Sequence, residues 1–340
     1  MRSDQGAAVP VSVLDTSPIV EGSTPRQALH NTVDLALVAD ALGYRRYWVP
    51  EHHGMRGVAG AAPAVLVAHL ASITRQIRVG AGGVLLPNHA PLVVAEQFGT
   101  LAALHRDRID LGIGRAPGGP AAAVDAIRPG GERTAKSFRQ QLAELGAYLD
   151  PAEDARVKAI PVLGGNTPQV WLLGSSTTSA ELAGELGLPY AFAHHLNPGS
   201  AAEATRTYRE RFRPSGPGAT PRTLVSVSVI AAEDDERAQW LAGSIRLKVL
   251  CRARGNRILL PSPEDAAAHP HLDGDRAEIS ARSHGLIVGS AETVCAQLQA
   301  VLDETGADEV MVTTPVHGHA DRCRSYELVS SLAPRLTPGP

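Results

Sequence analysis

The chain has 340 residues, of which 44% are hydrophobic and 20% charged, and its formal net charge is −3. This is the composition of an ordinary globular protein. The sequence has no basic run that would bind nucleic acid. It also has no apolar run of about 18 residues, the length needed to span a membrane. The first residues lack the apolar stretch of a signal peptide. Cys251, Cys295 and Cys323 are widely spaced, odd in number and show no CxxC or CxH pattern. We therefore expect a cytoplasmic protein with reduced thiols.

The first predicted strand, 11–14, is followed by a loop and a helix. Thr24 is expected to cap this helix, Pro25 to take its first position and Gln27 to complete a capping box. A glycine, Gly43, is expected to end the helix. Its buried face is predicted from helical spacing to comprise Leu29, Val33, Ala36, Leu37 and Ala41.

Strands and helices alternate along the rest of the chain. Further strands are predicted at 47–49, 77–86, 109–113, 170–173, 190–192, 224–230 and 309–312. Helices are predicted at 91–104, 176–186, 233–248, 290–306 and 321–332. Such alternation indicates a parallel sheet. Eight units favour a closed barrel over a doubly wound open sheet, and no G-x-G-x-x-G follows the first strand.

We therefore predict an α/β fold, a single (β/α)8 TIM barrel spanning residues 1–340. Insertions are predicted after strand 4, at about 114–168, and after strand 7, at about 251–285. The second insertion is the expected lid over the site. Residues 333–340 are expected to form a frayed tail.

In such barrels the active site is built at the carboxyl ends of the strands and in the loops that follow them. This rule selects a set of polar residues and glycines: Asp15, Glu51, His52, His53, Gly82, Gly83, Arg115, Gly174, Ser175, Ser176, His194, His195, Thr313, Thr314 and His317.

Two sites within this set, a turn and an arginine, predict a phosphate site between strands 4 and 5. The turn 174–176 leads into a helix, where unpaired amides and the helix dipole favour an anion. Arg115 follows the neighbouring strand and would place a guanidinium on the same anion. The alternatives are that Ser176 only caps the helix and that Arg115 only forms an ion pair at the rim.

The adjacent histidines give a second signal. Because neighbouring side chains on a strand point to opposite sides, only one of His52 and His53 is expected to face the pocket. A metal site would need about three convergent ligands, which His52, His194 and Asp15 would supply. Glu51 would either orient a neighbouring histidine or form a structural ion pair.

Gly82 and Gly83 lie late in an apolar strand, where glycine is unfavourable unless the backbone must approach something closely. A flat ring stacked on the strand would be one such partner, and a bulge or a tight barrel bend is the alternative.

Together these residues resemble the luciferase-like family of flavin-dependent monooxygenases. The resemblance covers nearly the whole chain and is carried, in order, by SVLDTSPIVEGST, YWVPEHHGM, RVGAGGVLLPNHAPLVVAEQFGTL, RIDLGIGRAPGG, VWLLGSSTTSAELAGELGLPYAFAHH and GADEVMVTTPVHGHADRCRSYELV. It implies a β/α barrel that binds FMN, with the phosphate held by Arg115, by Ser175 or Ser176, and by the backbone near Ser179. It also implies a cis peptide at Gly82–Gly83.

The activity implied by the resemblance is that of a two-component monooxygenase. Reduced FMN would come from a separate NAD(P)H:flavin reductase and react with O2 to a C4a-hydroperoxide. One oxygen atom would then pass to an organic substrate by hydroxylation, epoxidation or Baeyer–Villiger oxidation. His52 is the expected catalytic residue, and no metal is expected. The expected substrate contacts are Asp15, His53, His194 and His195.

Other functions stay open at this point. They are a deazaflavin-dependent oxidoreductase, a metal-dependent barrel hydrolase and a non-catalytic flavin-binding barrel. The family resemblance also suggests a tailoring step in secondary metabolism, such as antibiotic biosynthesis. It further implies a homodimer that pairs through helices near 63–75 and 91–104, with the apolar residues Val65, Leu66, Leu70, Leu92, Val93 and Phe98.

Overall fold

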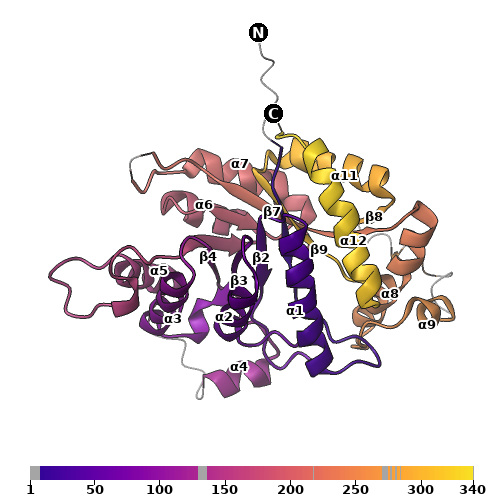
Figure 1. The fold of residues 1–340 in the computed structure, drawn as a ribbon, viewed down its shortest axis with the longest axis horizontal. Coiled ribbons are helices and arrows are strands. Elements are labelled where there is room, and N and C mark those ends of the chain that lie inside the picture. The colour runs from indigo at the N-terminus through magenta and orange to yellow at the C-terminus, as the bar shows by residue number, and fades with distance from the viewer. Residues whose placement is uncertain are drawn as a thin grey trace, which may run out of the picture.

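The computed structural model describes residues 8–128, 136–216, 218–269, 275, 278–279, 282–283 and 285–339. Its centre is a ring of eight parallel strands, closed by the pairing of the last strand with the first (Figure 1). The ring consists of β1 (Val11–Leu14), β2 (Arg46–Val49), β3 (Arg78–Leu85), β4 (Ile109–Gly114), β5 (Gln169–Gly174), β6 (Tyr190–Phe192), β7 (Thr223–Ala231) and β9 (Glu309–Thr313). The predicted TIM barrel is confirmed, and each predicted strand agrees with the structure to within one residue at either end.

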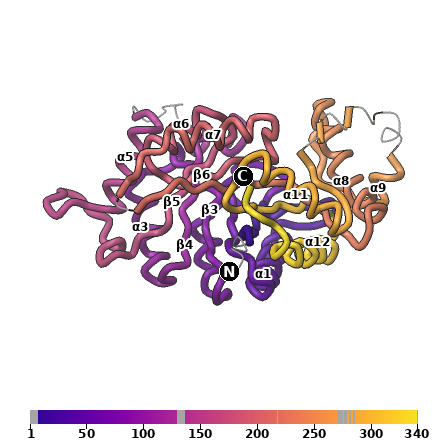
Figure 2. The backbone as a smooth tube through the Cα atoms, turned by 90° about the horizontal axis from the view of Figure 1, so that it is seen from above, coloured from indigo at the N-terminus to yellow at the C-terminus, as the bar shows by residue number. Residues whose placement is uncertain are grey.

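Helices cover the outside of the ring, and α1 and α12 lie side by side (Figures 1 and 2). The helices are α1 (Pro25–Ala41), α2 (Pro63–Ile73), α3 (Pro91–Leu104), α4 (Ala121–Ile127), α5 (Phe138–Leu149), α6 (Thr177–Glu185), α7 (Ala201–Arg211), α8 (Asp235–Ala253), α9 (Pro263–Ala267), α11 (Ala291–Thr305) and α12 (His319–Leu332). Short 3-10 turns are η1 (Leu86–Asn88), η2 (Ile160–Val162), η3 (Pro198–Ser200) and η4 (Ala333–Arg335).

A ninth strand, β8 (Leu286–Gly289), was not predicted from the sequence. It pairs with residues 228–231 of β7, beyond the part of β7 that pairs with β9. The strand therefore lies outside the closed ring. Its four residues are too few to show a period, and they directly follow an irregular segment, so the sequence pattern alone does not separate them from a loop.

The predicted start of α1 is confirmed only in part. Thr24 accepts a hydrogen bond from the Gln27 amide at 3.2 Å, but the Gln27 side chain donates to Asn31 instead of closing a capping box. The predicted buried face is wrong in part. Ala36 is buried and Val33 packs against the core, but Leu29 and Leu37 are 36% and 44% exposed. The buried residues of the helix are three alanines, one threonine and one leucine: Ala28, Thr32, Leu35, Ala36 and Ala39.

The described part of the C-terminal segment is packed and does not form the expected frayed tail. Leu336 is buried in the core, and its carbonyl accepts a hydrogen bond from the Val9 amide at 3.1 Å. Thr337 bonds to the side chain of Gln299 on α11. The prolines and glycine of this segment suggested disorder, but the burial of one leucine outweighs that signal. Pro340 lies outside the described residues.

The barrel interior is filled in layers from its N-terminal end. The bottom layer is charged: Arg46 lies 2.8 Å from both Asp110 and Glu309, and all three are buried. Above it is an apolar layer formed by Leu14, Trp48, Trp171, Ala191, Leu224 and Met311. These layers close the lower barrel, so space for a ligand begins only above them.

Two further expectations can be compared with the structure. The three cysteines are free, as expected. Among the residues that the structure describes, no helix has both the length and the apolar character needed to cross a membrane.

Candidate active site

A cavity of about 690 Å³ lies at the carboxyl ends of the barrel strands, within the range of about 300–1,000 Å³ that is usual for ligand pockets. Its apolar wall includes Leu14, Trp48, Leu224 and Met311 from the middle layer of the barrel. Polar groups enter it from the loops that follow the strands. The cavity is thus an apolar chamber with a polar rim.

The predicted phosphate residues meet at one side of this cavity. Gly174, Ser175 and Ser176 join β5 to α6 and line the cavity, as does Arg115 from the end of β4. Within α6 the Ala180 amide is the first to bond to a preceding carbonyl, that of Ser176. Ser176 caps the helix, as the alternative had it: it forms a capping box with Ser179 that uses the amides of both residues. The amides of Thr177 and Thr178 are left without a partner inside the helix. Arg115 is exposed and forms no ion pair with the described residues. The rim ion pair considered as an alternative is therefore not seen.

Two side chains fix the shape of the 174–176 turn. A Cβ atom at Gly174 would lie 1.9 Å from the Ser179 hydroxyl, so only glycine fits there. The Ser179 hydroxyl donates to the Ser176 carbonyl at 2.7 Å and contacts the Tyr190 hydroxyl at 2.9 Å. Ser179 also lines the cavity. The Ser179 amide in turn donates to the Ser176 hydroxyl in a capping box, so the amide of the preceding residue, Thr178, is the nearest one left to face an anion.

The two adjacent histidines point in different directions, as predicted. His52 lines the cavity, whereas His53 places its Nε2 atom 2.6 Å from Glu51. Burial, and then the neighbouring His53, lower the pKa of His52 below its ordinary value against the opposing effect of Glu51. The ring is therefore neutral at neutral pH, with one donor and one acceptor nitrogen. Its Nδ1 atom is buried and has no hydrogen-bond partner among the described residues.

Glu51 is an anchor for the end of β2. Its buried carboxylate accepts hydrogen bonds from the Leu85 amide at 2.9 Å, from Asn88 at 3.1 Å and from His89 at 2.9 Å. Burial alone would raise the pKa of Glu51, but hydrogen bonds from His89, His53 and the Leu85 amide lower it to about 2. The carboxylate is ionised, and it orients His53 and His89 rather than His52.

His195 supplies a second neutral ring to the cavity. Its Nδ1 atom lies 3.1 Å from the Ser226 carbonyl oxygen. A carbonyl oxygen only accepts hydrogen bonds, so Nδ1 carries the proton and Nε2 is an acceptor. Burial lowers the pKa of His195 to about 4. The hydrogen bond to Ser226 opposes this shift, and the nearby His194 adds to it slightly. The ring is thus a fixed, uncharged acceptor.

Three of the predicted substrate residues, Asp15, His53 and His194, are not among the described residues that line the cavity. Asp15 is fully buried and accepts hydrogen bonds from Arg322, Tyr47 and the Ser17 amide. His53 is held by Glu51, and His194 is buried behind the wall. Asp15, His52 and His194 therefore do not assemble as metal ligands. The strand-end rule selects a residue by its position alone. It does not detect that Arg322, on α12 far along the chain, forms a buried ion pair with Asp15.

The first insertion contributes residues that the sequence reasoning missed. Ser137, Phe138 and Arg139 at the start of α5 line the cavity, and Arg139 forms an ion pair with Glu185 of α6. Ser137 and Gln140 form a capping box, a pattern that marks a helix start in sequence but does not place that helix at a site. The second insertion was the expected lid. None of its described residues lines the cavity, and Leu260 instead pairs with Val20.

The glycine pair lies in the cavity wall, and its peptide bond is cis, as the resemblance implied. A Cβ atom at Gly83 would lie 2.6 Å from the Gly112 carbonyl oxygen, and one at Gly82 would lie 2.9 Å from the Trp48 ring. The register with β4 also shifts between Gly82 and Val84. The alternative of a bulge in the strand is therefore confirmed, and it does not exclude a ring stacked against the same backbone.

Comparisons with known proteins agree with this geometry. A family model described as luciferase-like monooxygenase matches residues 10–309. A luciferase-like monooxygenase of Escherichia coli (strain K12) is 40% identical over 326 residues, 96% of this chain and 97% of that one. The crystal structure of apo-MsnO8 has a TM-score of 0.89 at 42% identity and covers 97% of this chain and 99% of that one.

A more distant structure shares the fold. It is the oxygenating constituent of 3,6-diketocamphane monooxygenase from Pseudomonas putida, a type II Baeyer–Villiger monooxygenase in complex with FMN. It has a TM-score of 0.71 at 22% identity and covers 97% of this chain and 99% of that one.

Proposed function

The chain belongs to the luciferase-like monooxygenase family of flavin-dependent oxidoreductases, and we propose that it is the oxygenating component of a two-component system that uses reduced FMN and O2. The observation that carries this proposal is one continuous cavity. It joins the N-terminus of α6, beside Arg115, to a neutral, half-buried His52. The first feature suits a phosphate and the second suits the reactive end of a flat, largely apolar cofactor.

The residues present fit FMN. The α6 N-terminus and Arg115 would hold the phosphate, since amide donors, a helix dipole and a guanidinium all favour an anion. The wall at Gly82–Gly83 would lie against the flavin ring, and the unpartnered Nδ1 of His52 would find a partner there. When bound, reduced FMN supplies the electrons that activate O2.

The side chains of this chain would orient the reactants and control protons. His52 is neutral, so it would hold a proton on one nitrogen beside the reacting centre and accept on the other. The acceptor Nε2 of His195 would bind a donor group of the substrate. Apolar residues such as Leu14 and Met311 would exclude water from the same space. The substrate is accordingly proposed to be an uncharged, largely apolar organic molecule.

A separate reductase is part of the proposal. The chain has no glycine-rich nicotinamide fingerprint after its first strand, so it would receive reduced FMN made elsewhere. Mixing the protein, FMN, NADH and a generic flavin reductase under labelled O2 tests this directly. Oxygen from O2 should appear in an apolar substrate only when all components are present. A protein that binds FMN and never transfers oxygen would instead be a flavin-binding barrel, and preferential binding of a deazaflavin would favour the hydride-transfer alternative.

Arg115→Ala is expected to weaken FMN binding. Loss of a charge-assisted hydrogen bond costs about 1.5–3 kcal/mol, which corresponds to a roughly ten- to more than hundredfold higher Kd. Fluorescence titration of FMN measures the effect. Arg106→Ala is the matched control, because Arg106 precedes the same strand at the other end of the barrel and is 90% exposed. Equal FMN affinity of the Arg115 variant and wild type would remove the phosphate assignment.

We also propose that the chain forms a homodimer through α2 and α3. Of the residues predicted for this contact, Leu70 and Phe98 are buried in the core, and Leu66 and Leu92 pack against it. Val65 and Val93 are 72% and 45% exposed. Sedimentation equilibrium at micromolar concentration is expected to give twice the chain mass of 35.6 kDa. A single chain mass under these conditions would contradict the dimer.

A further inference from the structure

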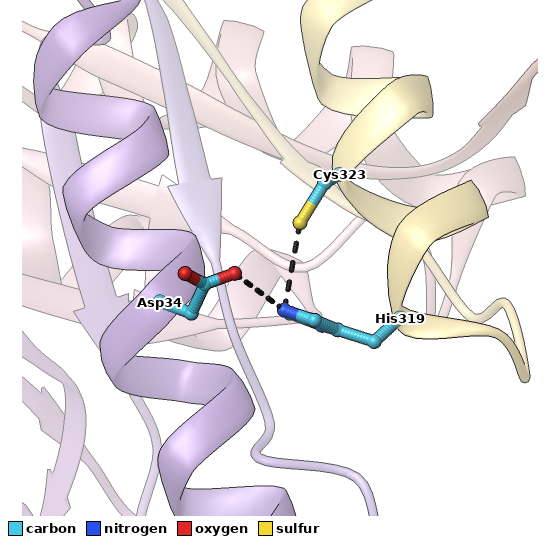
Figure 3. Close-up of side chains that lie close together, drawn as sticks. All are labelled: Asp34, His319 and Cys323. Carbon is cyan, nitrogen blue, oxygen red and sulfur yellow. Dashed lines mark hydrogen bonds and ion pairs between the residues drawn. The ribbon is translucent and has the colours of Figure 1, made fainter.

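Three side chains with metal-ligating atoms meet on the outside of the barrel, away from the cavity. Asp34 comes from α1, and His319 and Cys323 come from α12 (Figure 3). One ligand atom of each lies within 4.8 Å of those of the other two. Among the residues that the structure describes, no other group of three or more such side chains is close enough to share an ion.

The sequence and the topology together bring these residues to one point. His319 and Cys323 are four positions apart, so they lie one above the other on the same face of α12. The first and last helices of the barrel are neighbours because the ring closes between β9 and β1. Asp34 faces α12 from the adjacent α1 (Figure 3). No sequence rule applied to strand ends would find such a group.

The geometry differs from that of a proton relay. Asp34 Oδ2 lies 2.8 Å from His319 Nε2, and Cys323 Sγ lies 3.6 Å from the same nitrogen. In a thiol–imidazole–carboxylate relay the carboxylate bonds to the opposite ring nitrogen and orients the ring. Here both partners converge on one nitrogen. That arrangement is typical of ligands grouped around a common centre.

The distances suit a tetrahedral zinc ion. With Zn–N of about 2.0–2.1 Å and Zn–S of about 2.3 Å, tetrahedral geometry places nitrogen and sulfur about 3.6 Å apart, the separation seen for His319 and Cys323. The carboxylate oxygen would have to move outward by about 0.5 Å to reach the matching N–O separation. The Asp34 side chain is 62% exposed, so it is free to make this movement.

We propose that Asp34, His319 and Cys323 form a zinc site that clips α1 to α12. Imidazole and thiolate are ligands that zinc prefers, and carboxylate completes a set found in proteins. The carboxylate and the thiolate together neutralise the charge of the ion. The fourth position would be taken by water, since the group lies at the surface of the molecule. Such a clip joins the first and last strand–helix units of the barrel.

Zinc would compete with a proton for the thiol. Without metal, burial and then the nearby Asp34 raise the pKa of Cys323 to about 11, so the thiol is protonated and binding must release that proton. The other thiols differ in this respect. Cys251 and Cys295 are not part of any such group of ligands among the described residues.

Cobalt titration of tag-free, chelator-treated protein tests the site. We expect one Co²⁺ per chain, with a thiolate-to-cobalt charge-transfer band that Zn²⁺ abolishes by displacement. Cys323→Ser should remove the band. His319→Ala and Asp34→Asn should each weaken Zn²⁺ binding, the histidine variant by at least about 100-fold, because loss of even an outer-shell partner costs about 10–100-fold. Cys251→Ser, the matched control, should bind as wild type.

Two results would overturn the proposal. One is wild-type protein that shows no saturable cobalt band. The other is a band of normal intensity in Cys323→Ser, which would place the metal on another thiol. Circular dichroism of each variant separates a lost ligand from a lost fold, and Asp34→Asn changes a side chain that is 62% exposed. FMN affinity is expected to be the same in all of these variants, so the outcome is independent of the flavin site.

Discussion

His52→Ala is expected to bind FMN almost as wild type but to lose most oxygen transfer and to release hydrogen peroxide instead. The side chain lines the cavity, is neutral, and keeps a buried Nδ1 atom without a partner among the described residues. A positioned proton donor or acceptor typically contributes about 10²- to 10⁴-fold to a reaction. Product yield and peroxide release are measured together, with a supplied reductase and a substrate identified by incorporation of labelled oxygen.

His53→Ala is the paired control for this experiment. Its side chain is held by Glu51 and lies outside the cavity. Its loss should affect stability or substrate fit. The coupling, which is the share of reduced flavin that yields product, should stay near that of wild type. A reversed pattern, with coupling lost in His53→Ala and kept in His52→Ala, would move the catalytic role to the second histidine. Normal coupling in both variants would mean that neither ring takes part.

Arg322→Met is expected to lower the free energy of unfolding by about 3–5 kcal/mol, the usual effect of leaving one partner of a buried ion pair unpaired. Asp15 is fully buried, and its carboxylate is neutralised by Arg322 and bonded by the Tyr47 hydroxyl. Without the guanidinium, the carboxylate would stay buried or take up a proton. Urea unfolding followed by tryptophan fluorescence measures the loss.

The control for this prediction lies on the same helix. Arg324 is about half exposed and pairs with Glu233 and Glu327, so Arg324→Ala should change stability by at most about 1 kcal/mol. The double variant Asp15→Leu/Arg322→Met should recover part of the loss, because an apolar pair often replaces a buried ion pair without penalty. A single Arg322 variant as stable as wild type would show that the pair contributes nothing.

The same pair predicts a pH dependence with a definite sign. Burial alone would raise the pKa of Asp15, but Arg322, Tyr47 and Thr32 lower it overall. A carboxylate whose pKa is lower in the folded state stabilises the fold above its unfolded pKa of about 3.9 and loses that effect as the pH falls further. The stability difference between wild type and Arg322→Met should therefore shrink in acid.

The sequence predicted the barrel well because its strands are buried on both faces. Such strands read as short apolar runs between glycine and proline turns, and β3 and β4 are clear cases. The position of the 174–176 turn at the cavity was also predictable, since a strand end that leads into a helix start is a local property. Features that depend on contacts between distant segments were not. The face of α1 depends on the fit of Thr32 against the Ser17 and Tyr47 side chains, which helical spacing does not report.

The misplaced site residues have the same cause. Asp15 satisfies every local criterion for a residue at the mouth of the barrel, and only its partner, 307 positions further along the chain, turns it into a structural group. Arg139 shows the reverse case, because it reaches the cavity from an insertion whose path no sequence period describes. The type of chemistry at a position can thus be predicted from local sequence. Which partner a charged side chain pairs with depends on tertiary contacts, which local sequence does not show.

The position of β9 has a consequence for how the chain is made. This strand is the last of the ring to be synthesised, yet it pairs with β1 on one side and β7 on the other. Until residues 309–313 leave the ribosome, both of those strands keep an open edge of the kind that pairs with other chains. Translation at about 5–20 residues per second leaves the edge of β1 uncovered for about 15–60 s. Fast completion of the chain through β9 therefore shortens the time in which the edge of β1 can pair with another chain.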